Sequence, residues 1–252
     1  MTKLLQDKVC VITGAGKGFG RDLALIYLEH GAKLALITRS DADVLCLKAD
    51  ISPKNLEDCL IISGDVSDEK CVHDFISSAY AKFGRIDVLM NNAGMRFRRP
   101  FLEITLQEFK AVMDNNFFSM VFMSQAVLPH MIRAKKGKII NMTSVAGTLG
   151  LAHLSGYISS KAAIIGLTKS LAVEFAGDNV QVNAIAPGFS KTSYFENFQK
   201  NTELYKFTLD RIPMKRWGES AEIANVGVFL ASSLSDYITG DVINVDGGWS
   251  AW

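Results

Sequence analysis

The sequence predicts an α/β domain built around a doubly wound parallel sheet of about seven strands. Short runs rich in Val and Ile alternate along the chain with longer segments whose apolar residues recur at helical spacing. The short runs are nearly continuous in apolar content, as expected of strands that helices cover on both faces. No linker, low-complexity tract or internal repeat divides the chain, so we expect one domain spanning residues 1–252.

The predicted elements follow one another as β–α units. The strands are expected at 9–13, 33–38, 60–63, 87–90, 138–142, 180–185 and 242–245. The helices are expected at 20–29, 70–83, 106–132, 157–175 and 221–230. Right-handed crossovers between parallel strands place a ligand crevice beyond the carboxyl ends of the strands. Residues 189–211 are polar and weakly patterned, so we expect a mobile substrate segment over that crevice.

Composition excludes several classes of protein. The 27 Lys and Arg residues nearly balance 26 Asp and Glu residues, which argues against a nucleic-acid binder. The 48% hydrophobic content excludes a disordered chain, and no apolar run approaches the roughly 18 residues of a membrane span. The first strand pattern begins at Val9 without a secretory signal before it. The four Cys and four His residues lack metal-ligand spacing, so we expect a cytoplasmic protein with reduced thiols and no metal.

A glycine-rich turn, Thr13-Gly14-Ala15-Gly16-Lys17-Gly18-Phe19-Gly20, joins the first predicted strand to the first predicted helix. Glycines there permit a tight turn and close approach of the backbone to a pyrophosphate, which the helix N-terminus also attracts. The spacing Gly-x-x-x-Gly-x-Gly differs from the commoner dinucleotide fingerprint, and such a turn can also be purely structural. Its position favours a dinucleotide site in a Rossmann-type fold.

The end of the second strand favours NADP(H) over NAD(H). A reader of the ribose 2′-hydroxyl would be acidic, yet the strand ends Thr38-Arg39. The Arg39 guanidinium suits a 2′-phosphate, and Lys17 adds a second cation beside the same pocket. The alternative is that both are solvated surface cations.

Three residues carry candidate catalytic chemistry. Tyr157 and Lys161 are four apart and share one helix face, so the ammonium favours the phenolate of a group whose reference pKa is about 10. Such a tyrosine can act as general acid or base. Ser144 follows the fifth strand and could hydrogen-bond a substrate oxygen as charge develops on it. Each feature alone also occurs by chance, and their combination is what points to catalysis.

These motifs together resemble the short-chain dehydrogenase/reductase family over essentially the whole chain. The resemblance rests on the glycine turn, Asn91-Asn92-Ala93-Gly94, Asn116, Ser144, the Tyr157–Lys161 pair, and Pro187-Gly188 followed by Thr192. It implies that Asn116 joins Ser144, Tyr157 and Lys161 in catalysis, and that the chain forms a homotetramer. Ser119 and Thr143 depart from the residues usual in the family. The implied cofactor-binding residues are Gly14, Lys17, Gly18, Phe19, Gly20, Arg39, Asp65, Val66, Asn92, Ala93, Gly94, Tyr157, Lys161, Pro187, Gly188 and Thr192.

Three arginines follow the fourth strand, Arg96, Arg98 and Arg99, and one or more of them could hold a substrate carboxylate or phosphate. A solvated loop or a subunit contact explains them equally well. Residues 91–101, 186–192, 211–218 and 245–249 resemble gluconate 5-dehydrogenases and 2-deoxy-gluconate dehydrogenases, which implies a sugar acid or a similar polar substrate. Aromatic residues in the 189–211 segment keep a bulkier ketone open: Phe189, Tyr194, Phe195 and Phe198.

The predicted function is an NADP(H)-dependent oxidoreductase that interconverts a ketone and a secondary alcohol, with Tyr157 as general acid and base. The 3-oxoacyl-carrier-protein reductases share the same motifs, so reduction of a 3-oxoacyl thioester is the alternative activity. A non-catalytic dinucleotide sensor is the alternative from a different class, because a fold does not determine a function. The intact Asn116, Ser144, Tyr157 and Lys161 argue against it.

Overall fold

The computed structural model describes residues 3–192 and 195–251. Seven parallel strands form one sheet in the order β3-β2-β1-β4-β5-β6-β9, which confirms the predicted doubly wound Rossmann-type fold. A two-stranded sheet, β7 (Ser190–Lys191) with β8 (Gly218–Glu219), lies apart from it. The strands of the main sheet are β1 (Val9–Thr13), β2 (Lys33–Thr38), β3 (Cys59–Ser63), β4 (Val88–Asn91), β5 (Gly137–Met142), β6 (Val180–Pro187) and β9 (Val242–Val245).

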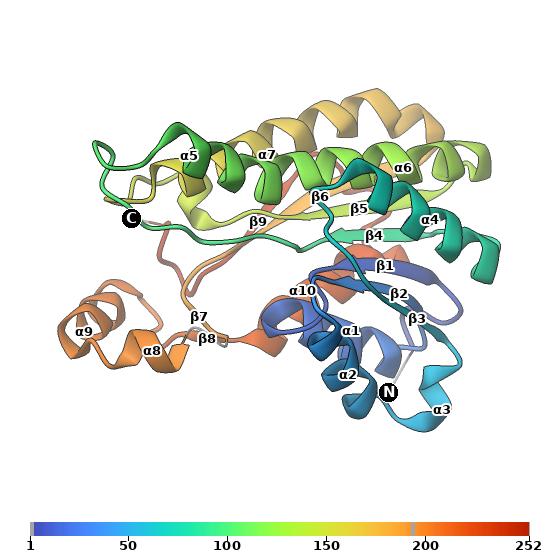
Figure 1. The fold of residues 1–252 in the computed structure, drawn as a ribbon, viewed down its shortest axis with the longest axis horizontal. Helices are drawn as coiled ribbons and strands as arrows, with labels where there is room; N and C mark the ends of the chain where they lie inside the picture. Colours follow the sequence, from blue (N-terminus) through green and yellow to red (C-terminus); the bar gives the residue numbers. More distant parts are fainter. Residues whose placement is uncertain (1–2, 193–194, 252) are drawn as a thin grey trace.

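Helices cover both faces of the sheet, as Figure 1 shows. The helices on one face are α4 (Glu69–Phe83), α5 (Leu106–Met113), α6 (Ser119–Ala134) and α7 (Ser155–Phe175). Those on the other face are α1 (Gly18–Glu29), α10 (Ser220–Ala231), α2 (Asp41–Asp50) and α3 (Pro53–Leu56). The sequence patterns had not indicated α2 and α3.

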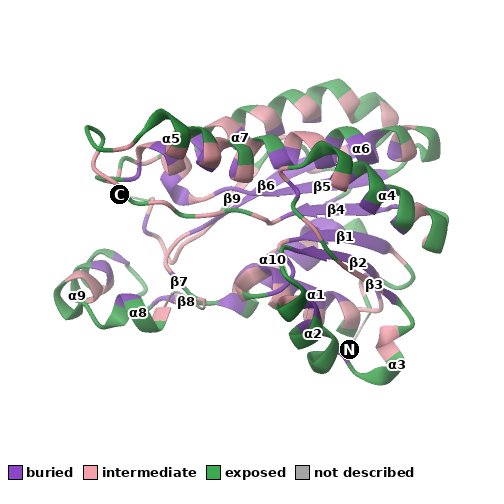
Figure 2. Cartoon of the chain, in the orientation of Figure 1, coloured by how far each residue is buried: buried purple, intermediate pink, exposed green. Residues whose placement is uncertain are grey.

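The inner strands β2, β1, β4, β5 and β6 are almost entirely buried, as Figure 2 shows, whereas the edge strands β3 and β9 are mostly half-buried. The side chains of each inner strand alternate between two cores. In β1, Cys10 and Ile12 join the core beneath α1 and α10, whereas Val11 joins the core beneath α4 and α6. Apolar burial on both sides explains why these strands read as continuous apolar runs in the sequence.

The predicted helix 106–132 is wrong in one respect, because it is not a single regular α-helix. A π-helical turn, Asp114–Phe118, separates α5 from α6, and the Ser119 amide bonds the Asp114 carbonyl five residues back. The Ser119 hydroxyl donates to the Asn115 carbonyl at 2.8 Å, which satisfies a buried serine at this position. Such turns add one residue to the helix and often occur at functional sites.

Residues 189–211 contain two short helices, α8 (Phe195–Gln199) and α9 (Thr202–Arg211), outside the main sheet. Both pack on Trp217, which is buried and donates from Nε1 to the Thr208 hydroxyl at 2.8 Å. Phe198 lies against the same indole, with ring centroids 4.9 Å apart, so it contributes to a local core. Mobility of this segment stays a prediction, and Tyr194 lies outside the described residues.

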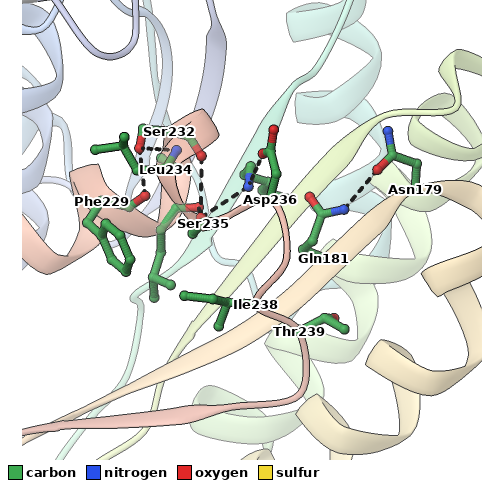
Figure 3. A network of polar contacts seen from close by, with 12 residues as sticks. Asn179, Gln181, Phe229, Ser232, Leu234, Ser235, Asp236, Ile238 and Thr239 are labelled. Atoms are coloured by element: carbon green, nitrogen blue, oxygen red, sulfur yellow. Dashed lines mark hydrogen bonds and ion pairs between the residues drawn. The ribbon is translucent and has the colours of Figure 1, made fainter.

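The amino ends of the strands carry a polar network (Figure 3). The Ser235 hydroxyl donates to the Ser232 carbonyl at 3.3 Å, and it accepts at 3.1 Å from the buried Lys138 ammonium. Lys138 also pairs with Asp236 at 2.8 Å. The network satisfies a buried charge at the edge of the sheet opposite the crevice.

Candidate active site

The crevice lies where β1 and β4 are neighbours and the strand order reverses, the usual ligand position in such sheets. The segment after β4 is tied to the glycine turn after β1. The Thr13 hydroxyl accepts from the amides of Asn92 and Ala93 at 3.0 and 2.9 Å, and the Asn92 side chain donates to the Thr13 and Gly14 carbonyls. Two predicted motifs therefore meet at one edge of the sheet.

The glycine turn leaves no room for side chains. A Cβ on Gly14, whose φ is +65°, would lie 2.9 Å from the Ala93 Cα, and one on Gly20 would lie 2.1 Å from the Gly14 carbonyl oxygen. Lys17 is the N-cap of α1 but gives no side-chain cap to its amides. This bare helix N-terminus beside a close-packed turn fits a dinucleotide pyrophosphate.

Arg39 and Lys17 are both exposed at the mouth of this turn. The Arg39 guanidinium pairs with Asp65 at 3.6 Å and hydrogen-bonds Asn115 of the π-helical turn. It therefore reaches from the end of β2 towards the segments after β3 and α5. The hydrogen bonds from Ser67 to Asp65, together with the charge of Arg39, outweigh desolvation and lower the pKa of the Asp65 carboxyl.

Sequence reasoning missed a carboxylate beside the same turn. Asp43, in the first turn of α2, lies so close to Gly16 that a Cβ there would be 2.6 Å from the Asp43 Cβ. The Thr38 hydroxyl donates to Asp43 at 3.3 Å, and the Asp43 amide donates to the capping hydroxyl of Ser40. The pattern Ser40-x-x-Asp43 was the signal for a helix start that folds this carboxylate back onto the strand end.

Asn116 is fully buried in the π-helical turn and clamps the segment after β4. Its Oδ1 accepts from the Met95 amide at 2.7 Å, and its Nδ2 donates to the Met95 carbonyl at 2.9 Å. The same Nδ2 donates to the Ser160 hydroxyl at 3.0 Å, and that hydroxyl donates to the Tyr157 carbonyl at 2.7 Å. Ser160 thus links two predicted catalytic residues, although no sequence motif singled it out.

Lys161 is buried below Tyr157 on α7. Its ammonium donates to the Met142 carbonyl at 2.7 Å and lies 5.7 Å from the centroid of the Tyr157 ring. Burial lowers the pKa of Lys161 to about 8. The Thr143 hydroxyl donates to the Lys161 carbonyl at 2.8 Å and so ties α7 to the end of β5.

Tyr157 and Ser144 lie together at the carboxyl end of β5. Burial raises the pKa of the Tyr157 hydroxyl, whereas its hydrogen bond with Ser144 and the positive charge of Arg96 lower it. The Ser144 oxygen also accepts from the Ala146 amide at 3.1 Å, which orients the hydroxyl. A phenol, a hydroxyl and a buried ammonium are therefore assembled beside the segment that contacts the glycine turn.

The predicted nicotinamide-side residues begin at Pro187, the last residue of β6. The Gly188 amide donates to the Val245 carbonyl of β9 at 3.0 Å. Thr192 returns to the glycine turn, since a Cβ on Gly18 would lie 3.8 Å from the Thr192 Cβ. The predicted nicotinamide-side residues therefore face the predicted pyrophosphate turn.

The remaining predicted residues differ in exposure. Phe19 and Val66 pack against the two cores of the sheet. Arg96 and Arg98 are exposed and Arg99 is partly buried, all in the stretch after β4. Within residues 3–192 and 195–251, no three His, Cys, Asp or Glu side chains form a candidate metal site, and no described helix has the length and apolarity to span a membrane.

Known proteins resemble this chain along nearly its full length. A family model described as enoyl-(acyl carrier protein) reductase matches residues 14–250. The 3-oxoacyl-[acyl-carrier-protein] reductase FabG of Thermotoga maritima is 37% identical, with 97% of this chain and 98% of the relative covered. The 2-dehydro-3-deoxy-D-gluconate 5-dehydrogenase of Dickeya dadantii is also 37% identical, with 98% of this chain and 97% of the relative covered.

The solved structures that are similar to this chain are also dehydrogenases or reductases by their descriptions. Levodione reductase superimposes with a TM-score of 0.92 at 35% identity, covering 98% of this chain and 99% of the other. An Agrobacterium tumefaciens protein described as a candidate 2-deoxy-D-gluconate 3-dehydrogenase, with bound NADP, gives a TM-score of 0.89 at 32% identity, covering 99% of both chains. With the fold, the order of the motifs and these likenesses in agreement, the chain belongs to the short-chain dehydrogenase/reductase family.

Proposed function

We propose that this protein is an NADP(H)-dependent oxidoreductase that interconverts a ketone and a secondary alcohol, with Tyr157 as general acid and base. The observation that carries the proposal is the meeting of Ser144, Tyr157 and Lys161 beside a glycine turn suited to a pyrophosphate. Asn116, linked to Tyr157 through Ser160, completes the group.

The chemistry that a bound nicotinamide supplies is hydride transfer to or from the carbonyl carbon. In reduction, the Ser144 hydroxyl donates a hydrogen bond to the substrate oxygen as negative charge develops on it. Tyr157 donates its proton to that oxygen, and in oxidation it removes the same proton. The Lys161 ammonium stabilises the resulting phenolate. Asn116 holds the Met95 main chain beside them.

NADP(H) as the cofactor is supported by charge at the mouth of the glycine turn. Arg39 and Lys17 supply two exposed cations for a 2′-phosphate, and NADP is bound in the similar Agrobacterium tumefaciens structure. Asp43 opposes this preference because its carboxylate would repel a nearby phosphate. Direct bidentate pairing by Arg39 is worth more than repulsion from a carboxylate already bonded to Thr38.

A sugar acid or a similar polar keto acid is the substrate class that we propose. Support comes from the arginines after β4 and from the likeness to the Dickeya dadantii 2-dehydro-3-deoxy-D-gluconate 5-dehydrogenase. Reduction of a 3-oxoacyl thioester is the second candidate. The Thermotoga maritima 3-oxoacyl-[acyl-carrier-protein] reductase is 37% identical to this chain, the same identity as the Dickeya dadantii relative. We further propose a homotetramer, as the family resemblance implies, and a cytoplasmic location, as the cysteine pattern of the sequence predicts.

The test is NADPH oxidation by the purified protein with 5-ketogluconate and related keto acids, run beside an acetoacetyl thioester. We expect turnover of at least one keto acid with a higher kcat/KM than the thioester. Turnover confined to the thioester would replace the sugar-acid assignment by the second candidate. NADPH binding without turnover of any carbonyl would support a dinucleotide sensor instead.

A further inference from the structure

The three arginines after β4 have different surroundings. The Arg99 guanidinium donates to Glu108 at 2.9 Å and lies 5.5 Å from the centroid of the Phe97 ring. Its amide donates to the His153 carbonyl at 2.8 Å. Arg99 therefore fastens the loop to α5 and to the segment before α7, and its charge is already paired.

The loop that carries Arg96 is anchored at both ends to the region around Tyr157. At one end, a Cβ on Gly94 would lie 3.6 Å from the Lys161 ammonium nitrogen. At the other end, Arg99 bonds the main chain of His153. Tyr157 lies between His153 and Lys161 in the chain, so the two anchors of residues 94–99 lie on either side of the start of α7, where Tyr157 is placed.

The main chain next to Arg96 is held in place. Asn116 bonds both the amide and the carbonyl of Met95, the preceding residue. The Arg96 side chain is exposed, and its charge acts on the phenol, because it lowers the pKa of Tyr157. Arg96 thus combines a fixed backbone, access to solvent and proximity to the proposed proton donor.

We propose that Arg96 is the specificity-determining residue, which holds the carboxylate of a keto or hydroxy acid beside Tyr157. This inference rests on the proposed function, because it names the residue that reads the acid. Arg98, two residues further along, is exposed without a comparable effect on the tyrosine. A planar guanidinium that pairs with a carboxylate in two parallel hydrogen bonds also fixes the orientation of the carbonyl.

The pairing couples substrate charge to proton transfer. Among the described residues, the cationic groups near Tyr157 are Arg96 of the β4 loop and Lys161 of α7, beside the neutral hydroxyl of Ser144. Along the chain, His153 and Lys161 are each four residues from Tyr157. A substrate carboxylate neutralises the field of Arg96, so Tyr157 retains its proton to higher pH in that complex. An acidic substrate thereby favours the protonated tyrosine that reduction requires.

The experiment compares Arg96→Ala, Arg96→Lys and the matched control Arg98→Ala on a keto acid and on an uncharged ketone of similar size, with NADPH. Loss of a charge-assisted pair predicts a drop in kcat/KM for the acid of about 30-fold or more in Arg96→Ala, mainly through KM. The drop for the uncharged ketone should be at least about tenfold smaller. Arg96→Lys should recover part of the loss, and Arg98→Ala should change both substrates by less than about threefold.

The pH profile gives a second readout that a structural role would not produce. With the uncharged ketone, Arg96→Ala should move the alkaline limb of kcat/KM to higher pH, because a cation that lowers the pKa of Tyr157 is gone. Equal losses on both substrates, or equal losses in Arg96→Ala and Arg98→Ala, would overturn the inference. A wild type that reduces neither substrate would instead refute the proposed function.

Discussion

The side chain of Asn116 bonds the main chain of Met95 on both sides, accepting from its amide at 2.7 Å and donating to its carbonyl at 2.9 Å. This contact joins the π-helical turn Asp114–Phe118 to the loop that leaves β4. The loop carries Gly94, a predicted cofactor residue, and Arg96, the residue proposed to hold the substrate. One buried side-chain amide therefore holds the main chain between these two residues.

Replacing Asn116 by Ala should destabilise the fold as well as the site. The change leaves the partly buried amide and carbonyl of Met95 and the buried Ser160 hydroxyl without these partners, at a cost in unfolding free energy of about 2 kcal/mol or more. Urea denaturation of the wild type and of Asn116→Ala measures this loss of unfolding free energy. The control is Asp114→Ala, at an exposed position of the same turn, where the expected cost is below about 1 kcal/mol. Equal costs for the two variants would contradict the clamp.

Lys161 should make stability depend on pH. Its pKa is about 8 in the folded protein and 10.5 ordinarily, so between these values the unfolded chain binds a proton that the folded chain has released. The contribution of Lys161 to stability therefore rises with pH in that window, by about 2 kcal/mol between about pH 7.5 and 9.5. The raised pKa of Tyr157 acts in the opposite direction only above pH 10.

The measurement is urea unfolding of the wild type and of Lys161→Met at several pH values within this window. Subtracting the two series removes the contributions of other groups, such as Lys8, whose pKa burial also lowers. A wild type and a methionine variant with the same pH slope would show that Lys161 is not desolvated as described.

Arg39→Ala should weaken NADPH binding selectively. Removing hydrogen bonds from a guanidinium to a phosphate costs about 1.5–3 kcal/mol, which is about 10- to 100-fold in Kd. The Kd for NADH should change by less than about threefold, because NADH lacks the 2′-phosphate. Fluorescence titration with both cofactors measures the ratio. Lys33→Ala, a loss of charge at the other end of β2, is the control, and an unchanged ratio in Arg39→Ala would remove the 2′-phosphate assignment.

The sequence predicted the sheet well because its inner strands are buried on both faces and their residues are therefore mostly apolar. The π-helical turn was not predictable in this way, since the apolar period continues through it and the contact between Asn116 and Met95 is tertiary. Asp43 was missed because its approach to Gly16 depends on the path of α2.

An exposed tryptophan near a chain end would be evidence of a subunit interface. Trp249 is buried within its own chain, with its ring centroid 4.9 Å from that of Phe189 and 4.7 Å from the Arg211 guanidinium. Trp252 lies outside the described residues. The homotetramer thus remains a proposal that rests on the family resemblance.

The role of Tyr157 as the proton donor is the central claim, and a Tyr157→Phe variant tests it most directly. Steady-state NADPH oxidation with the best keto substrate is measured for both proteins, and the Kd for NADPH is measured in parallel. Loss of a positioned general acid predicts a fall in kcat of about 10²- to 10⁴-fold while NADPH still binds. A phenylalanine variant that turns over the same substrate at the wild-type rate would contradict the account.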